Sequence, residues 1–194
     1  MDSQVITDKD YQDVLTIRAS ALAMFLLSLA MFFVAVNLVL VADGYSSGWN
    51  IDFQTADFDL WLFLGSLVLL VFVHEALHAL AALLWGKASF SSIRFGHNLK
   101  WLVAYCHCSS PMRMGAFRRL LLLPLAVTVP VAGLFLLLYP SLSTLLLFCL
   151  SFSACAGDVL IEFKVQNFPA DLWVQDHPSE VGCYVWPEGH SPQE

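Results

Sequence analysis

Three ionisable side chains lie within five residues of one long apolar run, in the stretch His74-Glu75-Ala76-Leu77-His78. On an α-helix, residues four apart lie on the same face, so both imidazoles can reach one metal ion with Glu75 beside them. In this zinc-peptidase pattern, the histidines are ligands and the glutamate is the general base. Ionisable groups inside an apolar span are costly, so their presence points to function. The pattern predicts a metal centre at His74 and His78, with Glu75 as the catalytic residue.

A catalytic zinc site usually has three protein ligands and one open position. The third ligand must come from another helix at a similar depth, and the last apolar run offers Asp158 after Ala156-Gly157. Counted from the ends of their runs at about 1.5 Å per residue, the three side chains lie within about 11 Å of depth. We therefore predict Asp158 as the third ligand, with Gly157 allowing close helix contact.

Other residues compete for these roles. Glu162 lies one turn beyond Asp158 and is either the ligand, a supporting group or a solvated end charge, whereas Cys155 is more typical of a packed apolar residue. The run Cys106-His107-Cys108 lacks the second pair of a structural zinc module, so we interpret it as a strand end. The other histidines are expected in a turn (His97) and in the solvated tail (His177, His190). The alternative to a metal site is a buried polar network between helices.

The composition places these residues in a membrane protein. Apolar residues make up 58% of the 194 residues and charged residues 13%, whereas soluble domains carry about 45–50% and 25%. Four runs reach the roughly 20 residues that a membrane-crossing helix needs. The predicted fold is an all-α membrane protein, a single domain over residues 1–194, with spans at Ala19–Ala42, Leu60–Gly86, Leu120–Tyr139 and Leu142–Phe163.

The positions of the basic residues predict the orientation. All nine Lys and Arg residues fall in the amino-terminal arm, the segment between spans two and three, and the tail, whereas the linker Asp43–Asp59 holds four Asp and no basic residue. The positive-inside rule then puts both termini and the central segment in the cytoplasm. A net charge of −7 excludes a nucleic-acid-binding surface, and five irregularly spaced cysteines imply no disulfide framework.

The polar segments between and after the spans have a structure of their own. Between spans two and three, Phe90–Phe95 and Leu99–Cys106 flank Gly96-His97-Asn98, which predicts a small cytoplasmic β-hairpin with its turn at these three residues. The tail Lys164–Glu194 contains four prolines, and we expect a partly ordered flap of irregular structure.

The motif His74-Glu75-Ala76-Leu77-His78, the following basic hairpin, the two prolines of span three and Gly157-Asp158 together resemble the integral-membrane zincin peptidases of bacteria, a family more distantly similar to the site-2 proteases. The tail stretch Asp176–Gly182 is also similar to that family's carboxy-terminal pattern. The resemblance covers residues 59 to 185. Site-2 proteases usually present the distal aspartate as Asp-Gly, whereas here the order is Gly157-Asp158.

The resemblance implies a zinc-dependent peptidase of a bacterial cytoplasmic membrane, with Zn²⁺ held by His74, His78 and Asp158 and with Glu75 as the base. Its expected partners are the lipid bilayer and a membrane-anchored protein or peptide substrate. The competing class is a non-enzymatic membrane protein that binds metal or acts as a scaffold. A transporter is disfavoured because four spans with one polar cluster do not suggest alternating access.

Overall fold

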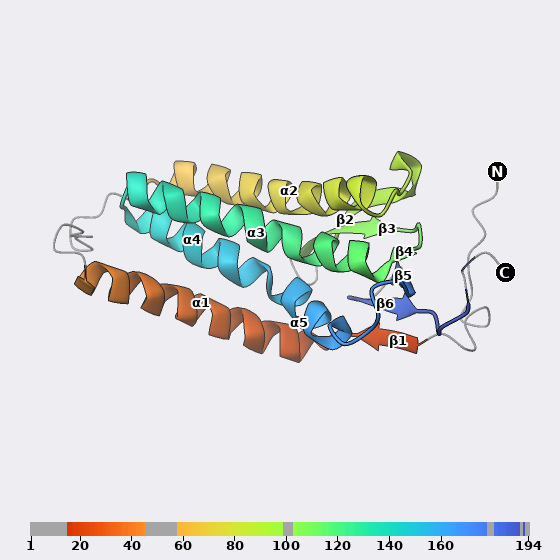
Figure 1. Ribbon diagram of the computed structural model, residues 1–194. Helices are drawn as coiled ribbons and strands as arrows, with labels where there is room; N and C mark the ends of the chain where they lie inside the picture. The colour runs from red at the N-terminus through yellow and green to blue at the C-terminus, as the bar shows by residue number, and fades with distance from the viewer. Residues whose placement is uncertain (1–14, 46–57, 99–102, 178–180, 191, 193–194) are drawn as a thin grey trace.

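Long helices lie side by side, and small β-sheets gather at one end of them (Figure 1). The computed structural model describes residues 15–45, 58–98, 103–177, 181–190 and 192. Helix α1 packs on α4 and α5, α4 packs on α3, and α3 packs on α2. The helices are α1 (Ala21–Tyr45), α2 (Leu60–Leu84), α3 (Met114–Leu138), α4 (Leu142–Ala154) and α5 (Ala156–Val165), with a short 3-10 turn η2 at Phe90–Ser92.

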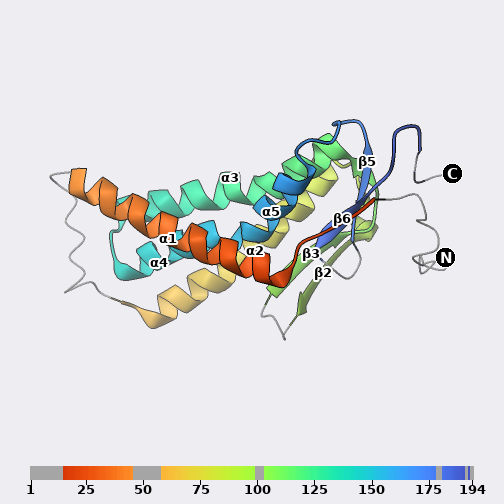
Figure 2. The ribbon, with the colours of Figure 1, turned by 90° about the horizontal axis from the view of Figure 1, so that it is seen from below.

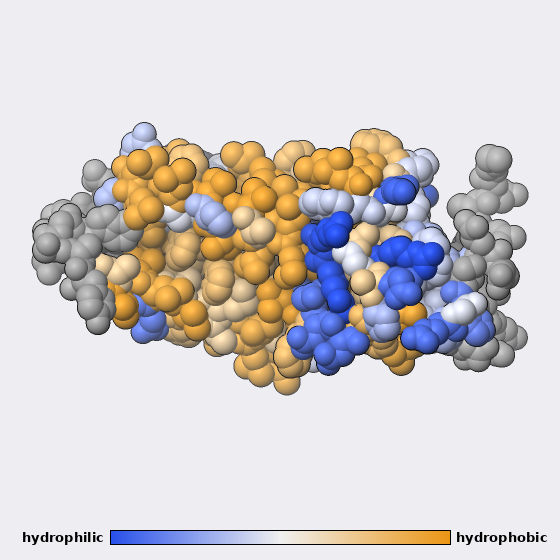
Figure 3. Space-filling view, in the orientation of Figure 1, coloured by the Kyte–Doolittle hydropathy of each residue, from blue (hydrophilic) through white to orange (hydrophobic). Residues whose placement is uncertain are grey.

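The outer surface of the helices is apolar. Four helical segments, with α4 and α5 forming one of them, are long and apolar enough to cross a membrane. Large apolar side chains such as Leu22, Val68 and Phe72 are more than 60% exposed on this surface. Figure 3 shows that the apolar surface over the helices gives way to a hydrophilic zone toward the sheets. This arrangement is compatible with the predicted multi-pass membrane protein.

The helix of the third apolar run is longer than the predicted span. Helix α3 begins at Met114 rather than Leu120, so it includes Arg118 and Arg119 in its first turns. Arg118 is accommodated there because its guanidinium donates to the main-chain carbonyls of Val165, Gln166 and Phe168 at 2.6–2.7 Å. These carbonyls belong to the last residue of α5 and to the segment that follows it, where no further helical turn supplies donors.

The fourth apolar run is two helices. Helix α4 ends at Ala154 and α5 begins at Ala156, with Cys155 between them at φ −78° and ψ 3°. In the last turn of α4, the hydroxyls of Ser151 and Ser153 donate to main-chain carbonyls three residues earlier. Such side-chain bonds compete with the helical ladder and bend helices. The bend gives α5 its own direction (Figure 1).

The predicted hairpin between spans two and three is present. Strand β2 (Ile93–Asn98) pairs antiparallel with β3 (Val103–Cys108). The predicted turn is wrong, because Gly96, His97 and Asn98 are part of β2 and pair with residues of β3. The residues that connect the strands, 99–102, lie outside the described residues, as does the start of the predicted strand Leu99–Cys106.

The tail contributes two strands to a sheet, so the predicted irregular flap is wrong, and the predicted all-α fold with one β-hairpin lacks this second sheet. Strands β1 (Leu15–Arg18), β6 (Gly182–Val185), β5 (Trp173–Asp176) and β4 (Met112–Arg113) form a four-stranded antiparallel sheet in that order. Gly182 is required where β6 meets β1, because a Cβ there would overlap the carbonyl oxygen of Ile17.

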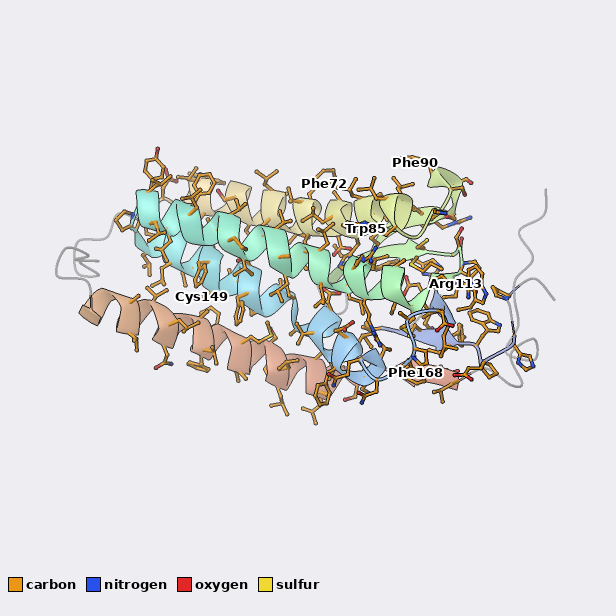
Figure 4. All side chains as sticks on the ribbon, viewed as in Figure 1. Phe72, Trp85, Phe90, Arg113, Cys149 and Phe168 are labelled. Carbon is orange, nitrogen blue, oxygen red and sulfur yellow. The ribbon has the colours of Figure 1, made fainter. Side chains whose placement is uncertain are left out.

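Apolar side chains fill the junction between the sheet and the helices. Phe117 of α3 is 2% exposed and packs in one cluster with buried residues of α5, β4, β5 and β6. At the outer side of the same junction, Arg113 lies with its guanidinium carbon 4.0 Å from the centre of the Trp173 ring (Figure 4). The sheet is thus packed against the ends of α3 and α5.

Asp176 at the end of β5 joins the sheet to the hairpin. Its Oδ2 accepts a hydrogen bond from Nδ1 of His107 at 3.0 Å and one from the main-chain amide of Cys108 at 3.3 Å. The view from below shows the hairpin beside β5 and β6 (Figure 2). Asp176 therefore holds β3 from a segment almost 70 residues further along the chain.

We predict that Asp176→Ala loosens β3. Removing a shared acceptor leaves two partly buried donors unpaired, which costs about 1–3 kcal/mol. Peptides covering β3 should then exchange amide hydrogen roughly 5- to 150-fold faster by mass spectrometry. Asp171→Ala, in the exposed turn before β5, is the matched control and should leave exchange in β3 unchanged. Unchanged exchange in both variants would show that Asp176 does not hold the strand.

Candidate metal centre

His74 and His78 form the first half of the centre. Both lie on one face of α2, four residues apart, and are 8% and 7% exposed. Their Nε2 atoms are 3.3 Å apart, and their rings meet edge to face with centroids separated by 5.0 Å. The predicted sharing of one helix face is confirmed.

Asp158 completes the group from another helix. Its Oδ2 is 3.2 Å from Nε2 of His74, and its Oδ1 is 3.4 Å from Nε2 of His78. It lies in the first turn of α5, three residues after the bend at Cys155, so the direction of α5 aims the carboxylate at α2. In the part of the chain that the structure describes, these three residues are the one group of His, Cys, Asp or Glu side chains close enough to share a metal ion.

The side chains of the three residues lie close enough together to share one metal ion. Zinc binds His nitrogen and carboxylate oxygen at about 2.0–2.2 Å in a tetrahedron, so neighbouring ligand atoms should be about 3.3–3.5 Å apart. The two Nε2 atoms are 3.3 Å apart, and each lies close to a different carboxylate oxygen of Asp158, at 3.2 Å for His74 and 3.4 Å for His78. With one atom taken from each residue, the three candidate ligand atoms lie within 4.8 Å of one another, and the residues fit the donor set of a three-ligand zinc site.

The second ring nitrogens of the two histidines differ. Nδ1 of His78 lies 3.0 Å from the main-chain carbonyl of Leu120 in α3. A carbonyl only accepts, so Nδ1 must carry the hydrogen, and the neutral ring then presents the lone pair of Nε2 to the centre. Nδ1 of His74 is buried and has no hydrogen-bond partner among the described residues. His78 is thus the ligand whose orientation the protein fixes.

Glu75 lies between the centre and the hairpin. It interacts electrostatically with His74, His78 and Asp158, and it lies near the main-chain amide of Cys106 in β3. The residue is partly exposed, unlike the two histidines. Glu75 therefore has a carboxylate free of the group of three and directed toward the polar end of the helices.

The rival ligands lie elsewhere. Oε1 of Glu162 faces Nε of Arg118 at 3.9 Å, and Sγ of Cys155 donates to the carbonyl of Ser151 at 3.4 Å. Neither is in the group of three. Gly157 does not face α2, and a Cβ there would make only an ordinary contact of 3.7 Å with Met24 of α1. The prediction that Gly157 is needed for close helix packing is therefore wrong.

The run Cys106-His107-Cys108 is the end of a strand, as predicted, and its side chains are not in the group of three that could share a metal ion. Burial raises the pKa of the Cys106 thiol to about 12 and also raises that of Cys108. Both sulfurs are therefore protonated at neutral pH in the metal-free protein. His107 instead pairs with Asp176.

Sequence reasoning missed two roles in the tail. Asp176 anchors β3, and His177 is buried at 7% exposure with its Nε2 bonded to the hydroxyl of Tyr184 at 3.1 Å. The prediction of a solvated His177 is wrong, because pairing of β5 with β6 brings Tyr184 over it. His190 is exposed as expected. The compact stretch around Asp176 was the available signal, but nothing local in it identifies His107 as the partner.

Comparison with known proteins identifies a family. The model of a family described as "Putative zincin peptidase" matches residues 67–173, more than half of the chain, and this range contains His74, Glu75, His78 and Asp158. No curated protein and no solved structure matches the chain. The more distant similarity to site-2 proteases is not tested by this match and stays a prediction. The chain belongs to this zincin peptidase family, which implies zinc as its cofactor.

Proposed function

We propose that the protein is a zinc-dependent, membrane-embedded peptidase that cleaves membrane-associated proteins or peptides. The observation that carries this proposal is the convergence of the side chains of His74, His78 and Asp158, whose closest polar atoms are 3.2–3.4 Å apart in each pair, with Glu75 next to them. The family match supports the same reaction class. The sequence pattern and the geometry thus favour one chemistry.

Each residue has a role in this proposal. Nε2 of His74, Nε2 of His78 and the carboxylate of Asp158 hold the ion. Zinc bound there would supply a Lewis acid that polarises the scissile carbonyl and acidifies water. Glu75 accepts a proton from the attacking water and passes it to the leaving amine, as a general base and then a general acid. Its partly exposed carboxylate, outside the group of three, suits this exchange of protons.

We propose that the hairpin side of the molecule is cytoplasmic. Strand β1, the hairpin and the tail sheet all lie at one end of the helices (Figure 1), and the basic residues of the described chain fall in these segments or in the adjoining ends of the helices. Both termini are then in the cytoplasm. Glu75 faces this polar end through Cys106, so water and substrate would reach the centre from the cytoplasmic side.

The outer edge of β3 is the proposed place where substrate is held. A peptide bond must be extended to be attacked, whereas a transmembrane helix ties each carbonyl to an amide four residues on. Addition of the substrate as a strand would replace those bonds with bonds to the enzyme. The amide of Cys108 points to Asp176 and therefore away from β2. Alternation along an antiparallel strand gives Ala104 and Cys106 the same direction, toward Glu75.

We predict that one set of variants distinguishes the ligand residues from the general base. His74→Ala and Asp158→Ala should strip zinc from the purified protein, because each removes one of three ligands. Glu75→Gln should keep about one zinc per chain and lose about 10²- to 10⁴-fold in cleavage, because only the proton acceptor is removed. Zinc is measured by elemental analysis, and cleavage with a quenched fluorescent library of transmembrane peptides in liposomes.

The matched controls are Glu162→Ala and Cys155→Ala, one turn on either side of Asp158. Both should retain zinc near the wild-type level, because neither side chain is in the group of three. Zinc retained by Asp158→Ala but lost by Glu162→Ala would contradict the ligand assignment. Equal zinc content in the wild type and His74→Ala would contradict the assignment of the metal centre. Full cleavage by Glu75→Gln would favour a metal-binding protein without this mechanism.

A second prediction concerns the edge of β3. Ala104→Pro removes an amide that points away from β2, so no bond to β2 is lost. Loss of one hydrogen bond to an added substrate strand, worth about 1 kcal/mol, should slow cleavage roughly fivefold at unchanged zinc content. Phe95→Pro is the matched control, because its amide points outward from the far edge of β2. Equal cleavage rates in the two variants would mean that substrate does not add to β3.

A third prediction concerns topology. In otherwise cysteine-free protein, a cysteine at Ser47 in the acidic linker should react with an impermeant maleimide added to intact cells. A cysteine at Ser110, after β3, should react only once the membrane is opened, because the positive-inside rule places it in the cytoplasm. Labelling of Ser110 from outside would invert the proposed orientation.

A further inference from the structure

Helix α3 contains a proline at the depth of the metal centre. Pro124 lies inside the helix and is among its fully buried side chains. In a regular α-helix, the amide of residue 124 donates to the carbonyl of residue 120. Proline has no amide hydrogen, and its ring also pushes against that carbonyl. The carbonyl of Leu120 is therefore left without its helical donor.

That same carbonyl is the partner of a proposed zinc ligand. Nδ1 of His78 donates to the oxygen of Leu120 across the α2–α3 interface at 3.0 Å. This bond fixes the hydrogen on Nδ1 and turns Nε2 toward Asp158 and His74. Among the described residues, the Leu120 carbonyl is the only main-chain acceptor for either histidine of the site. It is also the carbonyl that Pro124 leaves without a helical donor.

We propose that Pro124 is a positioning residue for the metal centre: by withholding a helical amide from Leu120, it reserves that carbonyl for Nδ1 of His78. The proposal rests on the proposed zinc site. Pro124 touches neither substrate nor metal, and it acts only through Leu120 and His78. The role of the proline is therefore the orientation and protonation of a ligand rather than a bend alone.

The residues around Pro124 support a locally adapted helix. The hydroxyl of Thr128 donates to the carbonyl of Pro124 itself at 2.8 Å, and Thr128 is 4% exposed. The same threonine contacts Cys155 at the bend between α4 and α5, three residues before Asp158. The irregular parts of α3 and of the α4–α5 segment therefore meet beside the centre.

Pro130, one and a half turns further along α3, provides a matched comparison. It also lies inside the helix and withholds an amide, in this case from Ala126. Both Pro130 and Ala126 are exposed, however, and face away from the protein interior. A proline that only bends the helix should be equivalent at the two positions, whereas a proline that frees an acceptor for His78 should matter only at 124.

The test is the zinc affinity of full-length protein in detergent, measured by competition with a chromophoric chelator. Pro124→Ala restores an amide that competes with His78 for Leu120, so the affinity should fall about tenfold, at the low end of the 10- to 100-fold range for lost ligand support. Pro130→Ala should stay within about twofold of the wild type. An unchanged affinity in Pro124→Ala would overturn the proposal.

A second replacement separates the missing amide from the proline ring. Lactic acid at position 124, introduced by cell-free translation, gives an ester that has no amide hydrogen and no ring. It should bind zinc as the wild type does, and loss of affinity in this ester would overturn the proposal even if Pro124→Ala fails to fold. In zinc-free protein, ¹⁵N shifts of His78 should report hydrogen on Nδ1 in the wild type and the ester, and a mixed tautomer in Pro124→Ala.

The outcomes also separate this proposal from the zinc site on which it depends. If neither the wild type nor His74→Ala binds zinc, the proposed function fails. If the wild type binds zinc, His74→Ala does not, and Pro124→Ala matches the wild type, only the role of Pro124 fails.

Discussion

Three ionisable side chains meet inside helices whose outer surface is apolar, and this contact constrains the rest of the structure. An ionisable group without a partner is expensive in such surroundings, because neither lipid nor apolar side chains can replace water. His74, His78 and Asp158 offset this cost only when their side chains converge, and the closest polar atoms of each pair are 3.2–3.4 Å apart. Helices α2 and α5 must therefore keep one relative position.

Two departures from regular helix geometry bear on that position. The bend at Cys155 ends α4 and lets α5 begin with Asp158 in its first turn. In α3, Pro124 leaves the Leu120 carbonyl to His78. An uninterrupted helix at residue 124 would use the Leu120 carbonyl internally, and an unbent helix at Cys155 would give Asp158 a different direction. Backbone irregularity at membrane depth is tolerated where it is buried in protein, which is the case at both places.

The parts of the site that sequence reasoning could predict depend on local rules. The spacing of His74 and His78 fixes a shared helix face whatever the rest of the chain does. Asp158 followed from depth, because spans have a known rise per residue. The zinc geometry and the choice between Asp158 and Glu162 needed the structure, since one helical turn decides whether a carboxylate points to α2 or to Arg118.

The parts that sequence reasoning missed depend on contacts between distant segments. Strand β1 has four residues and pairs with β6 across more than 160 residues, so no local period marks either one. Such pairing also buries His177, which looks solvated in the sequence. It places Asp176 against His107 and Cys108, and so fixes the strand whose amide at Cys106 meets Glu75. The tail therefore belongs to the site through β3, because the position of that strand sets what stands beside the proposed base.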